Sequence, residues 1–460
     1  MVATPRAGLQ LREMLTDRET ASLEAPSRRR LLPVGWPLVA LFTFYPLWWV
    51  LGVAPFVSIG VAIPLAIELR SRGKLRAPRG FGLWLLFLVW LLVGVLVLQV
   101  AAPEAIPTTS MARYFTFAFR YLWFLAATVV LLYVGNMREE LSLLWFCRVI
   151  GSMFIVIVAG GLLGWAAPKF EFNSVLEIVL GSKGKSPFLQ NLIHPTAAQI
   201  QDFLGYEQGR PSAPFAFTNS WGVNCAVTLP FFVVGWFHRA SQARRVVGVG
   251  VLVLAIIPII SSLNRGLWLA LTLCGLLLVV RMALQGRPLV LVGALVAAAL
   301  AASIIVASPL GDLIAVRLDN GNSNTGRTNL GTQTLESTWQ GSPVVGFGTT
   351  RDPAGNWVSI AAGATADCPR CTPPPLGTQG QFWLVLFASG FGGAIAYLGF
   401  FLYQLFRHFW MRSIYATAGL SAVAMHLITS PFYNTVDTSL LVILAAVGLM
   451  WRARVEAESL

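Results

Sequence analysis

Apolar stretches of about 20 residues, each poor in charged side chains, recur along almost the whole chain. A helix of this length crosses the hydrocarbon of a bilayer and satisfies its own backbone polar groups there. The pattern therefore predicts an all-α polytopic membrane protein with about 12 transmembrane helices. They are Leu31–Leu51, Val53–Leu69, Phe81–Ala101, Phe117–Gly135, Leu143–Ala166, Phe217–Phe237, Val246–Leu263, Asn264–Val280, Pro288–Leu310, Phe382–Phe406, Ile414–Tyr433 and Thr435–Trp451.

Two of the connecting segments, 167–216 and 311–381, are far longer than the rest. Loops of such length in a folded protein usually carry function. The seventh and eighth helices, in contrast, are joined by a tight turn around Ser261–Arg265. The predicted parts in chain order are a tail (1–30), five helices (31–166), a loop with short helices (167–216), four helices (217–310), a large loop (311–381), three helices (382–451) and a second tail (452–460).

Periodic apolar positions inside the two long loops predict further, shorter helices. In the first loop, Ser174–Leu180 and Ala197–Leu204 are expected to form short helices at the surface. In the second loop, Leu330–Trp339 is expected to form an amphipathic helix, which leads into the glycine-containing stretch Pro343–Gly348.

Composition excludes a soluble fold. Hydrophobic residues make up 56% of the 460 positions and charged residues only 12%, which is about half of the share usual in soluble globular proteins. So few charges cannot cover the surface of a soluble protein of this size, whereas a surface that faces lipid needs none.

The net charge of +13 raises the question of a nucleic-acid partner, and its distribution along the chain answers it. With the N-terminus inside, the predicted inner segments carry 21 basic and nine acidic residues, and the outer segments ten basic and eleven acidic. Basic residues favour the cytoplasmic side of a membrane. Both termini are therefore predicted to be cytoplasmic and both long loops external, and the excess charge needs no nucleic acid to explain it.

The cysteines and the inner loops give no sign of a cofactor. Cys147, Cys225 and Cys274 lie in predicted helices and are expected to pack as small apolar residues. Cys368 and Cys371 form a Cys-x-x-Cys in the large outer loop, where we expect a local disulfide, because a zinc site would need two more ligands. No P-loop or dinucleotide-binding motif occurs in the inner loops.

A series of short motifs follows a particular order in the second half of the chain. It alternates arginines placed before helices with glycine-rich turns. In sequence order the motifs are Arg210 ahead of Asn219, Asn264-Arg265-Gly266 at the start of a helix, Arg327 ahead of Trp339 and Pro343-Val344-Val345-Gly346-Phe347-Gly348, and Gln379-Gly380-Gln381-Phe382-Trp383 ahead of Gly390-Phe391-Gly392-Gly393.

This order resembles the O-antigen ligase and O-antigen polymerase superfamily of integral membrane glycosyltransferases, and the match extends from Arg210 to Gly393. The resemblance implies a GT-C-like fold in the cytoplasmic membrane of a bacterium. It also implies transfer of a glycan from a polyprenyl-pyrophosphate donor to a glycan or lipid-linked acceptor at the outer face, without metal or other cofactor. The residues it assigns to catalysis are Arg265, Arg210, Arg327 and Gln379.

One position departs from the ligases of this family. Eleven residues before Gly390 they usually carry the histidine of a His-Asn pair, and this chain has Gln379 there. Glutamine cannot act as a general base, although it can orient a hydroxyl or a phosphate oxygen. The departure favours a polymerase over a ligase. Outer carboxylates that could replace the base are Glu336, Asp312, Asp319 and Asp437, and the sequence does not choose among them.

Each arginine also has an ordinary interpretation. Guanidinium is a planar donor fork that stays charged, which suits the oxygens of a lipid pyrophosphate. An interfacial arginine such as Arg265 can equally extend to lipid headgroups, and Arg210 and Arg327 could be solvated loop charges. Arg120, inside the fourth predicted helix, is a candidate for substrate binding as an intramembrane charge.

Two asparagines complete the candidate site. Asn219 and Asn264 stand at predicted helix starts, where the side chain could bind sugar hydroxyls or cap the helix. A different class of function, a flippase for lipid-linked sugars or another secondary transporter, predicts two similar halves with charges near the middle of the membrane. The chain shows no internal repeat, and its candidate charges gather toward the outer face, which favours the transferase.

Overall fold

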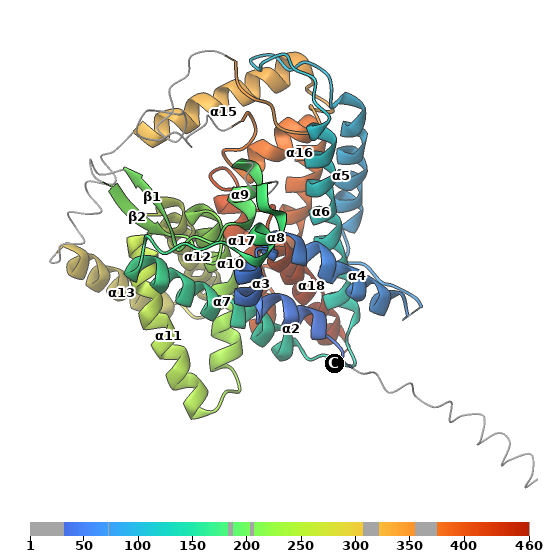
Figure 1. Ribbon diagram of the computed structural model, residues 1–460. Helices are drawn as coiled ribbons and strands as arrows, with labels where there is room; N and C mark the ends of the chain where they lie inside the picture. Colours follow the sequence, from blue (N-terminus) through green and yellow to red (C-terminus); the bar gives the residue numbers. More distant parts are fainter. Residues whose placement is uncertain are drawn as a thin grey trace, which may run out of the picture. The chain divides into compact units, whose positions relative to one another are not determined.

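We describe the protein from a computed structural model that covers residues 32–71, 73–182, 187–202, 207–306, 322–354 and 375–459 (Figure 1). The chain divides into two units, Met1–Trp36 and Pro37–Leu460. Only residues 32–36 of the first unit are described, and the last of them, Trp36, is the first residue of helix α2, so the account below concerns the second unit. The predicted disulfide of Cys368 and Cys371 lies outside the described residues.

The described part of the second unit is almost entirely helical (Figure 1). Its elements, in chain order, are α2 (Trp36–Phe42), α3 (Tyr45–Leu51), α4 (Ala54–Arg70), α5 (Phe81–Val93), the 3₁₀ helix η1 (Gly94–Val97), α6 (Ala112–Asn136), α7 (Leu143–Ala166), α8 (Val175–Leu180), α9 (Pro187–Ile193), β1 (Ala198–Asp202), β2 (Glu207–Pro211), α10 (Thr218–Phe237), α11 (Gln242–Ser261), α12 (Arg265–Leu284), α13 (Leu289–Val306), α15 (Asn322–Gly341), α16 (Gln381–His408), α17 (Ile414–Thr429) and α18 (Thr438–Glu458).

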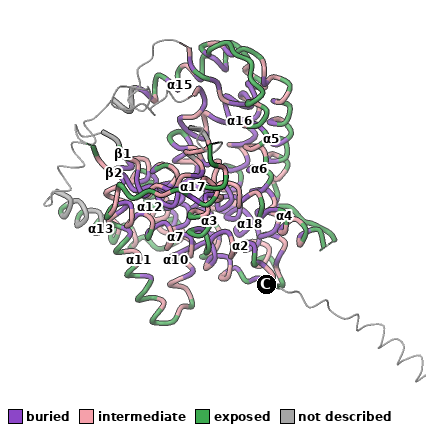
Figure 2. Tube along the Cα trace, in the orientation of Figure 1, coloured by how far each residue is buried: buried purple, intermediate pink, exposed green. Residues whose placement is uncertain are grey.

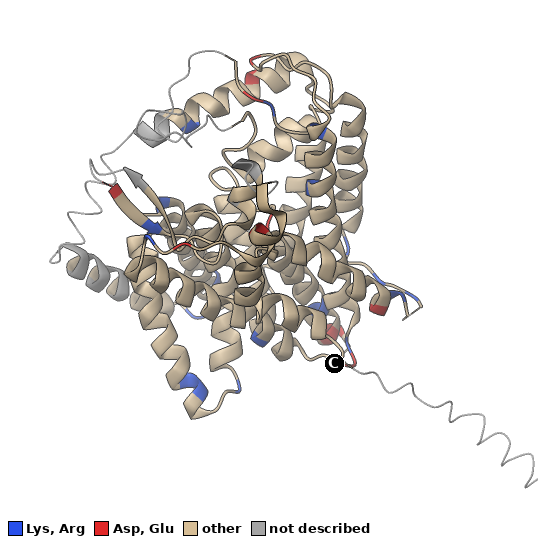
Figure 3. Ribbon diagram, in the orientation of Figure 1, with Lys and Arg blue, Asp and Glu red and all other residues tan. Residues whose placement is uncertain are grey.

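Every predicted apolar stretch contains helix, and among the described residues seven helices are long and apolar enough to cross a membrane. The protein is therefore a helical membrane protein. Basic side chains lie mostly at or near helix ends, and the long helices carry few charges along their length (Figure 3). The three cysteines predicted to pack as apolar residues, Cys147, Cys225 and Cys274, are buried and form no disulfide.

The first predicted helix, Leu31–Leu51, is wrong as a single helix. It is divided into α2 and α3 between Phe42 and Tyr45, and Phe44 has non-helical dihedral angles. Pro46 explains the break, because proline has no N–H to donate to the carbonyl four residues earlier. Gly52, in the left-handed conformation at φ 77°, then ends α3.

The centre of the unit is α18, whose apolar window is 89% buried, against 17% for α11 and 22% for α12. Helices α6, α17 and α10 pack against it, and the buried side chains concentrate there (Figure 2). Small residues such as Ala445, Ala446 and Gly448 let these neighbours approach closely. The helices α11 and α12 lie at the periphery, whereas the turn that joins them, Ser262–Asn264, is buried.

The stretch Ala198–Asp202 is a strand, so the prediction of a short helix at Ala197–Leu204 is wrong over these described residues. β1 pairs with β2 in an antiparallel hairpin, with Gln199 opposite Arg210 and Ile200 opposite Gly209. Pairing with a partner strand satisfies the backbone of such a short segment better than a single helical turn could. The other predicted short helices are confirmed as α8, with Ser174 as its cap, and α15, which extends beyond Leu330–Trp339 at both ends.

Helix α16 contains a kink to which the stretch Pro343–Gly348 of the large loop is bound. Gly390 has φ 61° and ψ −170° inside the helix, which leaves the carbonyls of Phe387 and Ala388 free of their helical donors. The amides of Phe347 and Gly348 bind these two carbonyls at 2.8 and 2.9 Å. The two glycine-containing motifs identified in the sequence therefore pack against each other.

Candidate active site

Three of the four predicted catalytic residues come from separate elements and meet around one turn. Arg210 lies on β2, Arg265 is the first residue of α12, and Arg327 lies on α15. The turn is Ser262–Asn264, between α11 and α12, and it contacts Tyr433 of the loop between α17 and α18. We call these residues the arginine site: Arg210, Ser262, Asn264, Arg265, Arg327 and Tyr433.

The predicted tight turn before Arg265 is confirmed. Helix α11 ends at Ser261, and Leu263 adopts φ 50°, which reverses the chain. The side chain of Asn264 caps α12 by accepting a hydrogen bond from the amide of Leu267 at 3.0 Å. This cap fixes the first turn of α12 and with it the position of Arg265.

Arg210 is buried, with only 6% of its surface exposed, so its interpretation as a solvated loop charge is wrong. Its Nε donates to the carbonyl oxygen of Ser262 at 2.7 Å. Thr218, the first residue of α10, donates its hydroxyl to the Arg210 carbonyl at 3.2 Å. The hairpin, α10 and the α11–α12 turn are thus connected through Arg210.

Tyr433 is a residue of the site that sequence reasoning missed. Its hydroxyl donates a short hydrogen bond to Asn264 Oδ1 and accepts one from the amide of Gly266 at 3.0 Å. A Cβ at Gly266 would come within 2.4 Å of the tyrosine ring, so glycine is needed for this close approach. The prediction placed Tyr433 inside a helix, whereas α17 ends at Thr429 and a loop begins.

Arg327 lies over the ring of Tyr433, with its guanidinium carbon 5.5 Å from the ring centroid. Such a cation–π contact holds the guanidinium without neutralising its charge. Arg265 and Arg327 lie close enough to repel each other electrostatically. The site therefore concentrates positive charge in a way that favours a bound anion.

Gln379 lies beside the same helix as Arg327. Its Nε2 donates to the Thr334 hydroxyl at 3.4 Å, and Gln379 is only 8% exposed. Thr334 follows Arg327 by seven residues, about 10 Å along α15. Among the described residues the Oε1 atom of Gln379 has no hydrogen-bond donor, so this oxygen remains able to accept a hydrogen bond from a hydroxyl group of a ligand.

Gln381, which is not among the predicted site residues, binds the loop that carries Tyr433. Its amide donates to the Tyr433 carbonyl at 2.9 Å, and its side-chain oxygen accepts from the amide of Thr435 at 3.1 Å. It stands two residues after Gln379, so the start of α16 contacts both α15 and the loop that carries Tyr433.

The two asparagines differ in role. Asn264 uses its oxygen for the helix cap and Tyr433, and its Nδ2 donates to the Thr218 carbonyl at 3.3 Å. These contacts are internal, which supports capping over sugar binding for Asn264. Asn219 is half-buried next to Thr218 in the first turn of α10, and its predicted role in binding stays a prediction.

The structure gives Arg120 a different setting from the arginine site. Its Nη1 donates to the hydroxyls of Thr349 and Thr350 at 3.0 and 3.3 Å. The small cavity beside it is lined mainly by apolar and aromatic side chains of α5, α6 and α16. Arg120 therefore connects α6 to the segment that follows α15, and this geometry does not bring it together with the three other arginines.

Among the carboxylates left open as a base, Asp437 is described and half-buried. Its Oδ1 accepts from the amide of Ser439 at 2.7 Å and from Asn224 Nδ2 at 3.3 Å. Asn224 lies on α10, fewer than two turns after Thr218. Glu336 is on the exposed side of α15, and Asp312 and Asp319 lie outside the described residues.

Comparison with known protein families, with characterised proteins and with solved structures finds no match to this chain.

Proposed function

We propose that this protein is a membrane glycosyltransferase that polymerises, or alternatively ligates, oligosaccharide units carried on polyprenyl pyrophosphate. The observation that carries the proposal is the meeting of Arg210, Arg265 and Arg327 around the Asn264–Tyr433 contact. The resemblance of the motifs from Arg210 to Gly393 to the O-antigen ligase and polymerase superfamily supports it. The product would be a cell-surface polysaccharide.

The proposal includes a topology. The chain would have twelve membrane spans in a GT-C-like arrangement, in the cytoplasmic membrane of a bacterium, with both termini in the cytoplasm. The arginine site would then lie at the outer face, because α12 begins there. The distribution of basic residues between the predicted inner and outer segments supports this orientation.

The reaction follows from the charges. A hydroxyl oxygen of the acceptor sugar attacks the anomeric carbon of the donor glycan, and the bond from that carbon to the pyrophosphate oxygen breaks. The electron pair leaves with polyprenyl pyrophosphate. The three guanidinium groups would bind this leaving group and offset the charge that develops on it, which is the largest contribution in many transfer reactions.

The hydroxyl proton needs an acceptor or a delayed release to water. Gln379 cannot take the proton, but its Oε1 could hold the acceptor hydroxyl in line for attack. The arrangement favours a polymerase over a ligase of the histidine-containing type, because no histidine stands at this position of the chain. Asp437 is the described carboxylate that contacts α10, through Asn224 Nδ2 at 3.3 Å.

Proteoliposomes test the proposal directly. They would contain the purified protein and a synthetic polyprenyl-pyrophosphate oligosaccharide, and both elongated glycan and released polyprenyl pyrophosphate would be measured. We expect one polyprenyl pyrophosphate released for each new glycosidic bond, and neither product with Arg265→Ala. Movement of the intact lipid-linked sugar across the bilayer without a new glycosidic bond would instead establish the transporter and refute the transferase.

A further inference from the structure

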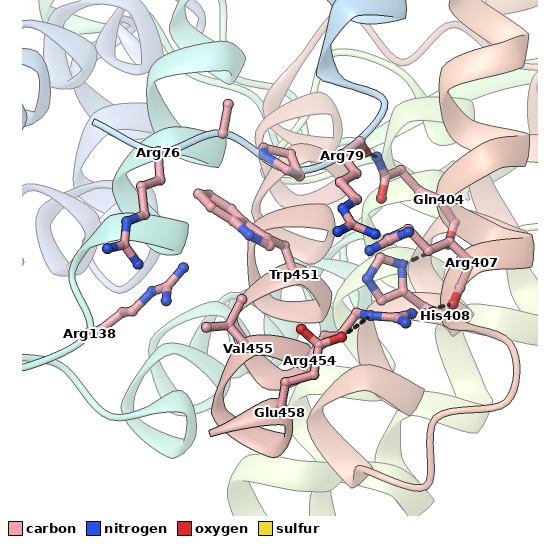
Figure 4. A pocket seen from close by; sticks show the side chains of 12 residues that line it. Arg76, Arg79, Arg138, Gln404, Arg407, His408, Trp451, Arg454, Val455 and Glu458 are labelled. Atoms are coloured by element: carbon pink, nitrogen blue, oxygen red, sulfur yellow. Dashed lines mark hydrogen bonds and ion pairs between the residues drawn. The ribbon is translucent and has the colours of Figure 1, made fainter. Parts of the chain in front are cut away.

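A second group of arginines surrounds a cavity of about 580 Å³ formed by the ends of several helices (Figure 4). The cavity lies between the segment that precedes α5, the end of α6, the end of α16 and the end of α18. These ends belong to the side predicted to be cytoplasmic, whereas the arginine site is at the opposite ends of α16 and α18. The charged lining residues are Arg76, Arg79, Arg138, Arg407, Arg454 and Glu458.

The lining carries a large excess of positive charge, because five arginines face one glutamate. Figure 4 shows Arg76 and Arg138 on one side of the Trp451 indole, and Arg79, Arg407 and Arg454 on the other. Burial lowers the pKa of Arg138, and the nearby charges of Arg76 and Arg452 lower it further. Positive charge is thus crowded here to a degree that a bound anion would relieve.

The positions of these arginines are set by contacts with the protein. Arg454 donates to the Arg407 carbonyl at 2.9 Å and to Glu458 at 2.8 Å. The guanidinium of Arg138 stands over the Trp451 ring at 5.3 Å. The carbonyl of Arg79 accepts from Gln404 Nε2 at 2.9 Å. The cavity is therefore a built feature of the fold and not a chance gathering of flexible side chains.

Two buried polar atoms in the lining have no hydrogen-bond partner among the described residues. They are Nε2 of His408 and Oε1 of Gln404, in side chains that are 1% and 0% exposed. His408 Nδ1 lies 2.8 Å from the Gln404 carbonyl, which assigns the proton to Nδ1 and leaves Nε2 as an acceptor. Both atoms can therefore accept a hydrogen bond from a hydroxyl group.

Exposed aromatic residues on the same end of α16 indicate the depth of the cavity in the membrane. Tyr403, Phe406 and Trp410 are 37%, 70% and 62% exposed. Aromatic side chains of this kind are enriched at the level of lipid headgroups. A cavity at this end of α16 would open at the level of the headgroups, which favours a lipid headgroup over a ligand free in the cytoplasm.

We propose that this cavity binds the headgroup of an anionic phospholipid, with the arginines on the phosphate and with His408 Nε2 and Gln404 Oε1 accepting hydrogen bonds from headgroup hydroxyls. Basic pockets between membrane helices on the cytoplasmic side are suited to such headgroups. The site shares no residue with the arginine site. The inference therefore does not rest on the proposed transferase activity.

Native mass spectrometry of the purified full-length protein tests the proposal. The protein would be titrated with phosphatidylglycerol, which has both a phosphate and hydroxyls, and in parallel with zwitterionic phosphatidylcholine. We expect saturable binding of phosphatidylglycerol alone, and about tenfold weaker binding in the double variant Arg79→Gln/Arg407→Gln. The matched control is Arg245→Gln with Arg287→Gln, since these arginines are outside the cavity and the loss of charge is the same.

The other outcomes are decisive as well. Equal loss of binding in the control pair would show a general charge effect and refute a built site. Displacement of the lipid by inorganic phosphate at equal concentration would refute a lipid headgroup in favour of free phosphate. His408→Phe gives a second readout: it should weaken phosphatidylglycerol binding and leave phosphatidic acid, which lacks headgroup hydroxyls, unchanged. Thermal unfolding of each variant in lipid-free detergent checks that it remains folded.

Discussion

Arginines in this protein do two different kinds of work at the residue scale. Arg351 and Arg281 are 2% exposed and bind backbone carbonyls: Arg351 donates to Leu98 at 2.6 Å, and Arg281 to Phe409. Such contacts satisfy carbonyls at chain turns and helix ends. Arg265 and Arg327 instead repel each other. The position of an arginine in the sequence does not by itself show whether it binds backbone carbonyls or contributes positive charge to a site.

Arg265 should tolerate no replacement if it binds pyrophosphate. Arg265→Lys keeps the charge but loses the planar fork and should impair transfer. Arg265→Ala should cost about 2–4 kcal/mol in transition-state stabilisation. Glycan chain length in cells that lack the native protein, complemented at matched expression, measures both, with exposed Arg245→Ala as control. Long polymer of normal length with Arg265→Ala would exclude this residue from the mechanism.

Tyr433→Phe tests whether the hydroxyl of Tyr433 holds the turn that carries Arg265. The substitution keeps the ring under Arg327, but the amide of Gly266 loses its hydrogen-bond acceptor. The free energy of unfolding should therefore fall by about 1–2 kcal/mol. We also expect a lower rate of glycan transfer, because the turn that positions Arg265 is less well held. Thermal unfolding and transfer are measured together, and Tyr114→Phe, at an exposed tyrosine, is the control. Unchanged stability and activity would contradict the assigned contact.

At the scale of elements, the kink of α16 and the Pro343–Gly348 stretch act as one unit. The amide of Phe391 donates to the Pro343 carbonyl at 2.7 Å, in addition to the two bonds from Phe347 and Gly348. The large loop is thereby attached to α16 about two to three helical turns after Gln379. The loop helix α15, with Arg327 and Thr334, is positioned through this attachment.

Gly390→Ala should detach the Pro343–Gly348 stretch from α16. A Cβ at Gly390 would lie 2.5 Å from the backbone of Val344, and a positive φ costs an alanine about 1–3 kcal/mol in addition. We expect a lower unfolding temperature and faster proteolysis of the segment after α15. Gly399→Ala on the same helix is the matched control, because its Cβ would meet only Leu83 at 3.8 Å. Equal effects of the two substitutions would argue against the attachment of the Pro343–Gly348 stretch to the kink of α16.

At the scale of the whole molecule, two groups of arginines lie at opposite ends of the helices. The cavity of five arginines and the arginine site lie at opposite ends of α16 and α18. Such a distribution orients the protein in the membrane, because basic residues favour the side of the anionic leaflet. The five-arginine end is accordingly the one expected in the cytoplasm.

Cysteine labelling tests this orientation. In a Cys368→Ser/Cys371→Ser background the remaining native cysteines are buried. A membrane-impermeant reagent on intact cells should label Gln340→Cys, which is exposed on α15, and should not label Ser241→Cys, exposed before α11. Permeabilised cells should label both. Label on Ser241→Cys in intact cells would reverse the predicted topology.

The sequence alone was sufficient for the helices and for part of the site. α7 begins and ends at the predicted residues, Leu143 and Ala166, because in lipid a segment must satisfy its own backbone and so length and apolarity decide the helix. The Asn264–Arg265 turn followed from local signals in the same way. These features depend on residues close together in the chain.

The tertiary structure decided everything that requires distant segments to meet. Tyr433 reaches Asn264 across 169 positions of sequence, and the cavity arginines come from four separate elements. The strand at Ala198–Asp202 exists because β2 pairs with it, and Gly390 could bend α16 because a loop supplies new donors for its carbonyls. Such contacts depend on how helices pack side by side, and the apolar pattern of each helix carries little information about which neighbour it will choose.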